Sequence, residues 1–222
     1  MAGITVVTEA STYPLEVKDV KNFLKLDENE DELYVRSLIG SATEYVESYT
    51  SLSLINRTLK LSLDYLSEID VPLWEGTRTG PDITIRKTII NLPSSPVSSV
   101  THIKTFDDQD TETTFASSKY YVDTASKPAR IILRSGETWP TALRVGNAVE
   151  ITYVAGYGTS PKQVPEQIRL AMMQYIAFMY EHRGDFERFP PPSMPSSIEV
   201  LLQSFRTLSF SSNPLSSQDR IY

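Results

Sequence analysis

The pattern of apolar positions near the start of the chain has the period of a helix. Between residues 30 and 49, apolar side chains recur at steps of three and four, which places them on one helix face. This stripe consists of Val35, Leu38, Ile39, Ala42, Tyr45, Val46 and Tyr49. A shorter helix is predicted at residues 15–26, because Pro14 suits a first helical turn. Its inward-facing residues are Leu15, Val20, Phe23 and Leu24.

The middle of the chain changes to a period of two. In residues 56–64, Leu59, Leu61 and Leu63 fall on one face, and polar side chains alternate with them, as in a half-buried strand. Further strands are predicted at residues 83–92, 100–106, 120–122, 130–133 and 149–154. Residues typical of turns separate them, so this block predicts a small antiparallel sheet or a barrel-like insert.

Residues 164–182 return to a helical period. Ile168, Met172, Tyr175 and Met179 form one stripe. A helix with further apolar residues over most of its remaining surface is buried on several sides, and one side is predicted to meet a neighbouring subunit. The predicted subunit interface consists of Leu170, Met173, Ala177, Phe178 and Tyr180.

A proline-rich spacer at residues 190–195 and a short helix at 196–208 complete the pattern. The polar, Ser-rich residues 209–222 show no periodicity and predict a flexible tail. The predicted fold class is therefore α+β: a helical bundle core with an inserted antiparallel β subdomain and a flexible C-terminal tail. The predicted boundaries are 1–55 and 159–208 for the two helical parts, 56–158 for the insert and 209–222 for the tail.

Composition narrows the class of protein. The 222 residues carry a net charge of −7, which argues against a surface that grips DNA or RNA but not against one that surrounds DNA without binding it. The chain has no cysteine, which excludes disulfides and thiolate metal sites. It shows neither a secretory signal nor a run of apolar residues long enough for a membrane span. The expected setting is a cytoplasm or a particle assembled there.

No motif predicts catalysis, a cofactor or a metal site. The acidic run 107–112 has oxygen ligands for Ca²⁺ but lacks the spacing of a calcium loop, which favours a solvated hairpin tip. His182 lies near Glu181 and Asp185, yet the sequence has no G-x-S-x-G serine for a histidine base to activate. A histidine at a helix end, where the helix dipole favours it, is the simpler interpretation.

Pieces spread over residues 15–206 resemble a known family by their order and spacing. They are 15–27 (LEVKDVKNFLKLD) with the acidic run 30–33, then 42–61, 92–100, 121–123, 139–140, 149–157 (VEITYVAGY), 164–170, 180–183 and 198–206. Together they resemble the head–tail connector proteins, also called adaptor or head-completion proteins, of tailed bacteriophages and gene transfer particles.

The resemblance implies a structural virion protein. Such a protein forms a ring of about a dozen subunits under the portal, meets a stopper or tail protein on its other side, and lines the channel through which DNA leaves. It would lie in the neck of the virion, and in the host cytoplasm before assembly. The C-terminal segment would dock on the portal, with Leu208, Phe210, Leu215, Ile221 and Tyr222 as candidate anchors.

Two other hypotheses remain open from the residues alone. The β insert could be a free-standing binding module for a carbohydrate or a protein, which requires aromatic residues such as Trp74, Tyr120 and Trp139 on one open face. A hydrolase that uses His182 and nearby carboxylates is a more distant third hypothesis.

Overall fold

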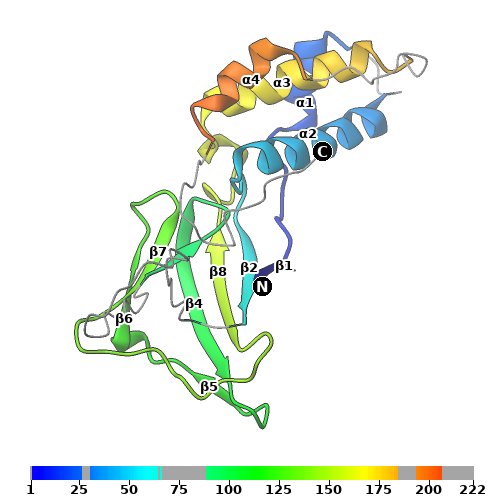
Figure 1. Ribbon diagram of the computed structural model, residues 1–222. Helices are drawn as coiled ribbons and strands as arrows, with labels where there is room; N and C mark the ends of the chain where they lie inside the picture. The colour runs from blue at the N-terminus through cyan, green and yellow to red at the C-terminus, as the bar shows by residue number, and fades with distance from the viewer. Residues whose placement is uncertain (1, 27–30, 65, 67–88, 185–193, 207–222) are drawn as a thin grey trace, which may run out of the picture.

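The computed structural model describes residues 2–26, 31–64, 66, 89–184 and 194–206. Within these residues the helices gather at one end of the molecule and the strands at the other (Figure 1). The helices are α1 (Val17–Leu24), α2 (Glu32–Thr50), α3 (Glu166–Glu181) and α4 (Ser196–Gln203). The strands are β1 (Ala2–Thr8), β2 (Arg57–Leu63), β3 (Ile89–Leu92), β4 (Val97–Phe106), β5 (Glu112–Thr114), β6 (Tyr120–Asp123), β7 (Ala129–Leu133) and β8 (Val149–Ala155). The predicted α+β class is confirmed.

Helix α2 is the long element of the helical end, and its apolar stripe faces the other helices. The stripe residues that are buried as predicted are Val35, Leu38, Ile39, Ala42 and Val46. Tyr45 is exposed, so its predicted burial is wrong; its ring nevertheless lies 5.1 Å from that of Tyr175 on α3. In the short helix α1, Val20 is buried as predicted, whereas Phe23 is exposed, contrary to prediction. Leu24, the next residue, packs against the helical cluster in its place.

Five strands form one antiparallel sheet in the order β1-β2-β8-β4-β5. The alternation predicted for β2 is confirmed, because Leu59, Leu61 and Leu63 are buried while the residues between them are partly exposed. Strand β8 lies at the centre, paired with β2 on one side and β4 on the other. Its near-continuous burial follows from this position.

A second antiparallel sheet of three strands, in the order β3-β7-β6, completes the β part. The buried residues of both sheets form one hydrophobic cluster, which includes Ile103, Ile131 and Ile151. The helices form another, which includes Ile39, Ile168 and Met172. A helical bundle as the core of the whole chain is therefore not confirmed, because the β part has a hydrophobic cluster of its own.

Three stretches of chain connect the helical end with the sheets: residues 9–16, 51–56 and 156–165. Backbone hydrogen bonds tie the second and third together, since Tyr157 N donates to Leu54 O and Asn56 N donates to Gly158 O. Gly156, at φ +143°, lies so close to Asn56 that a Cβ atom there would stand 2.4 Å from the Asn56 nitrogen. This close approach holds the exit of β8 against the entry of β2.

The hydrophobic pattern of the sequence did not predict two of the strands, β1 and β5. Residues 4–8 (ITVVT) are rich in residues that favour strands, but the segment is short and lies outside the block of alternation. In β5 the three residues are polar and exposed, so no hydrophobic period marks them. Among the described residues, no helix has the length and apolar character needed to cross a membrane.

Candidate assembly surfaces

The predicted interface residues all lie on α3, between Leu170 and Tyr180. Leu170 is 43% exposed, which leaves its side chain available to another molecule. Met173, Ala177, Phe178 and Tyr180 are half-buried, and Met173 and Tyr180 pack against the helical cluster. Their assignment to a subunit interface stays a prediction. Val200 on α4 and Leu33 on α2 add exposed apolar side chains to the helical end.

Tyr180 is already engaged within the chain. Its hydroxyl donates a hydrogen bond to Asp31 at the start of α2, and Arg183 Nη1 lies 3.4 Å from the same Asp31 oxygen. The hydrogen bond from Tyr180 lowers the pKa of Asp31 and raises the pKa of Tyr180 itself. Because these contacts join the start of α2 to the end of α3, part of the predicted surface holds the helical end together.

An ion pair that the sequence did not reveal lies where α2 meets β2. Arg57 Nη1 is 3.1 Å from Glu47 Oε2, and both side chains are largely buried. The carboxylate of Glu47 also accepts a hydrogen bond of 2.8 Å from Leu54 N, and Arg57 Nε donates to Ser53 Oγ at 3.2 Å. Burial raises the pKa of Glu47 despite these partners.

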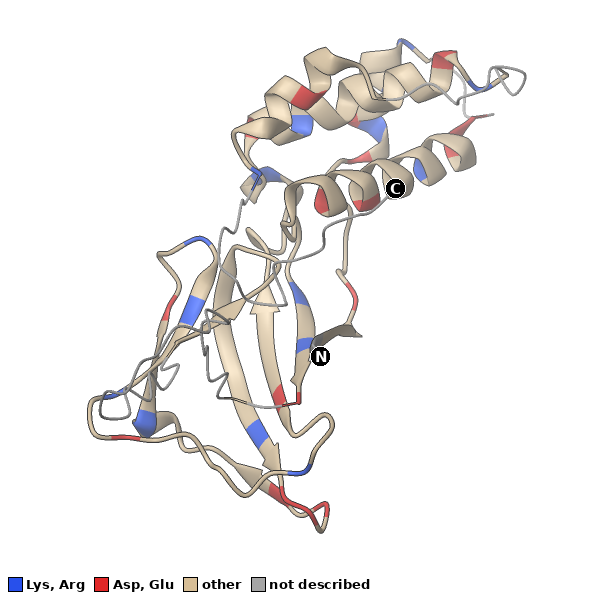
Figure 2. Ribbon diagram, in the orientation of Figure 1, with Lys and Arg blue, Asp and Glu red and all other residues tan. Residues whose placement is uncertain are grey.

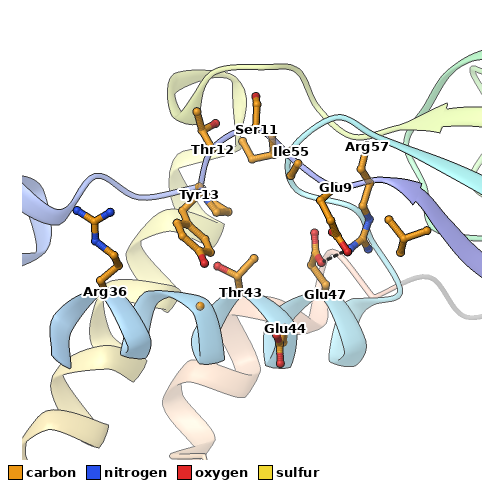
Figure 3. A pocket seen from close by; sticks show the side chains of 14 residues that line it. Glu9, Ser11, Thr12, Tyr13, Arg36, Thr43, Glu44, Glu47, Ile55 and Arg57 are labelled. Carbon is orange, nitrogen blue, oxygen red and sulfur yellow. Dashed lines mark ion pairs between the residues drawn. The ribbon is translucent and has the colours of Figure 1, made fainter. Parts of the chain in front are cut away.

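This ion pair lies in the wall of a hollow of about 690 Å³ (Figure 3). The N-terminal connection forms one side of the hollow and α2 the other, with Tyr13 facing Thr43 across it. The lining mixes three carboxylates with two guanidinium groups: Glu9, Glu44 and Glu47 with Arg36 and Arg57. The same lining also includes apolar side chains, among them Val6, Tyr13 and Ile55.

The acidic run 107–112 forms the hairpin between β4 and β5. Asp107 Oδ1 accepts hydrogen bonds from the backbone nitrogens of Gln109 and Thr111, and these bonds lower the pKa of Asp107. The carboxylate thus closes the turn, as an Asx turn does. Among the described residues, no group of three or more His, Cys, Asp or Glu side chains is placed to hold a metal ion.

The aromatic residues proposed for a binding face are packed inside the β part. Trp139 and Tyr120 are buried, and the ring of Phe115 lies 5.1 Å from Trp139 and 6.0 Å from Tyr120. Trp74 lies outside the described residues. Since the two described aromatic residues fill the core, the hypothesis of an open aromatic face is not favoured.

His182 follows the last residue of α3 and caps the helix. Its Nδ1 lies 2.8 Å from the carbonyl oxygen of Phe178, and the two rings are 4.3 Å apart. This position agrees with the prediction of a histidine at a helix end. The hydrolase hypothesis also invoked Asp185, which lies outside the described residues, as do the five predicted anchors of the C-terminal tail.

Charges of both signs are spread over the helical end and the sheets rather than gathered in one basic patch (Figure 2). Exposed apolar side chains, among them Leu33, Leu170 and Val200, lie on the helices. The model of one family, "Head completion protein", matches residues 15–189. The chain therefore belongs to the head completion protein family, and its predicted role as a structural protein of the head–tail connector in the virion is confirmed.

Solved structures with the same fold come from gene transfer agent (GTA) particles. A chain in the neck of an empty GTA particle, computed with C6 symmetry, gives a TM-score of 0.71 at 22% identity, covering 95% of this chain and 98% of that one. A chain of the native GTA virion gives 0.67 at 22% identity, with coverages of 94% and 97%. A chain of the native GTA neck, computed with C12 symmetry, gives 0.64 at 22% identity, with coverages of 95% and 98%. No curated protein matches the sequence.

Proposed function

We propose that the chain forms a ring of about twelve subunits between portal and tail, and that the ring lines the channel through which DNA leaves the head. The observation that carries this proposal is the likeness, over 95% of the chain, to a protein in the neck of a GTA particle computed with C12 symmetry. Membership of the head completion family is consistent with that place. The role is structural, and no catalytic step is assigned to it.

The charge of the chain suits a channel. A net charge of −7 gives a wall that repels a polyanion, so DNA passes without being held. Figure 2 shows Lys and Arg interspersed with Asp and Glu along the described residues. In this proposal DNA therefore passes through the ring without being bound by it.

The helical end supplies the proposed subunit contact. Leu170 on α3 is exposed, and the residues that follow it on the predicted face are half-buried. Exposed apolar side chains on closely packed helices are typical of surfaces that another protein covers. The C-terminal tail, with Leu208, Phe210, Leu215, Ile221 and Tyr222, is proposed as the segment that docks on the portal.

The test is the particle mass of the purified protein, alone and mixed with portal particles, by native mass spectrometry. A ring of about twelve copies that forms on the portal supports the proposal. A protein that remains a monomer in the presence of portal contradicts it. A variant truncated after Arg206 is the control for the docking segment: it should keep the fold and lose binding to the portal.

A further inference from the structure

The first strand of the chain lies at an open edge of the five-stranded sheet. Strand β1 pairs with β2 alone, in an antiparallel register that runs from Ala2 opposite Leu63 to Thr8 opposite Thr58. Figure 1 shows β1 at the margin of the sheet, away from the three-stranded sheet. Within the described residues, the outer backbone groups of β1 have no strand beside them.

Two apolar side chains of β1 lie on the same face of the sheet as buried core residues, but outside the part of that face that is buried. Ile4 lies opposite Leu61 and Val6 opposite Leu59, so all four share one face. Leu61 is 0% and Leu59 1% exposed, whereas Ile4 is 47% and Val6 43% exposed. The hydrophobic core therefore ends between β2 and β1, and an apolar strip continues outside it.

This edge lacks the features that keep sheet edges from pairing. Residues 2–8 contain no charged residue and no proline, and side chains of this kind are the usual protection of an edge strand. The irregularity between Val6 and Thr8 lies at the end of the strand, so residues 2–6 present a regular edge. An edge of this kind is suited to adding a strand from another molecule.

The opposite edge of the same sheet is also open. Strand β5 pairs with β4 alone, and its three residues are exposed. Since Phe115 N donates to Ile103 O, the backbone of Thr114, one residue earlier, points away from β4. One sheet thus presents two different free edges on opposite sides of the subunit, as a head-to-tail contact requires.

We propose that β1 of one subunit pairs with the β5 edge of its neighbour, so that the sheets of adjacent subunits join. This inference rests on the proposed ring and adds a second contact to the one through α3. Pairing of β1 with the β1 of another copy would be self-complementary and would close at a dimer, whereas a ring needs two different edges. The contact satisfies the outer backbone groups of β5 and of the part of β1 that pairs with it, and it brings the neighbouring sheet beside Ile4 and Val6.

The first test places lysine on the strip. The double variant Ile4→Lys/Val6→Lys should keep its fold, since both side chains are already exposed, and should weaken ring formation on the portal about tenfold or more. Val145→Lys, at a loop position that is 93% exposed, is the matched control and should assemble as the wild type does. A double variant that forms the normal ring overturns this inference and leaves the proposed function standing. A wild-type protein that forms no ring with portal overturns both.

The second test identifies the partner strand, because the chain has no cysteine of its own. In assembled rings, Val6→Cys/Thr114→Cys treated with a flexible bis-maleimide should give a ladder of linked subunits on a denaturing gel. Leu33→Cys/Thr114→Cys, with its first cysteine on α2, is the control and should give no ladder. Linked dimers from Val6→Cys alone, or no ladder from Val6→Cys/Thr114→Cys in intact rings, would overturn the assignment to β5.

Discussion

Glu47 and Arg57 form an ion pair of 3.1 Å that joins α2 to the first residue of β2. The carboxylate also receives the backbone N–H of Leu54, so it orients the segment through which the chain passes from helix to sheet. Because Gly156 packs against the same segment, this junction sets how the helical end and the sheets are held together.

Arg57→Ala should destabilise the protein more than a comparable change at the surface. Removal of the guanidinium leaves the largely buried Glu47 without its cation, and loss of one partner of a buried pair costs about 3 kcal/mol. Arg36→Ala breaks an exposed pair with Glu32 and should cost less than about 1 kcal/mol. Urea unfolding of both variants at pH 7 measures the difference. Equal losses would show that the Glu47–Arg57 pair contributes no more than a surface pair.

Glu47→Gln should change how stability depends on pH. Burial raises the pKa of Glu47 in the folded protein above its ordinary value of 4.5. The folded state therefore binds the proton more tightly than the unfolded state, and this contribution is present below pH 4.5 and lost as pH rises through the folded pKa. The free energy of unfolding of the wild type, relative to Glu47→Gln, should fall over that window. Equal pH profiles for the two proteins would contradict it.

Asp123→Asn should show the opposite dependence on pH. Hydrogen bonds from Ser126 and Arg130 lower the pKa of Asp123 to about 2. Its contribution is therefore present above the ordinary value of 3.8 and lost as pH falls toward about 2. Asp123→Asn should lower the midpoint of thermal unfolding at pH 6, and its difference from the wild type should shrink on acidification. A difference that stays constant down to pH 2 would contradict this assignment.

Gly156→Ala should destabilise the junction. The backbone at φ +143° disfavours a side chain, and a Cβ atom would lie 2.4 Å from Asn56 N, which is backbone and cannot rotate away. A loss of more than about 1 kcal/mol is expected, measured as a lower midpoint of thermal unfolding. Gly146→Ala, where a Cβ atom would meet nothing within 4 Å, is the control and should change stability by less than about 0.5 kcal/mol. Similar midpoints for both variants would show that the junction can move to admit the side chain.

Leu170→Glu should impair assembly while the monomer stays folded. The side chain is 43% exposed on α3, so a carboxylate is tolerated in the free subunit but is desolvated in a subunit contact. Leu33→Glu, on α2 at a position 82% exposed, is the matched control. Native mass spectrometry with portal present should show fewer rings for Leu170→Glu alone. Loss of rings in Leu33→Glu instead would move the contact to α2.

The periodic parts of the fold were predictable, since a buried face imposes its own spacing. The steps of three and four in α2 and the alternation in β2 predicted both elements and most of their buried residues. Segments without a hydrophobic period were not predicted, or the burial of their side chains was predicted wrongly. Strand β5 has no apolar residue, and the outward direction of Phe23 depends on how the short helix α1 packs.

The candidate surfaces were predictable only in part. The sequence predicted an apolar face on α3, but not that Tyr180 would be held by Asp31, a residue 149 positions away in the chain. It gave no sign that Glu47 and Arg57 would pair, because neither residue belongs to a motif. The five anchors proposed for the tail lie outside the described residues and stay a prediction.

By itself the sequence determined the periodic helices and strands, the order of those elements and the family, because local periodicity and the spacing of pieces are properties of the chain. Only the tertiary structure decided which apolar residues stay uncovered. Ile4 and Val6 resemble core residues in the sequence, yet they are exposed because β1 lies beyond the reach of the second sheet. Exposure depends on what packs against a residue, and in this fold the packing partners come from distant parts of the chain.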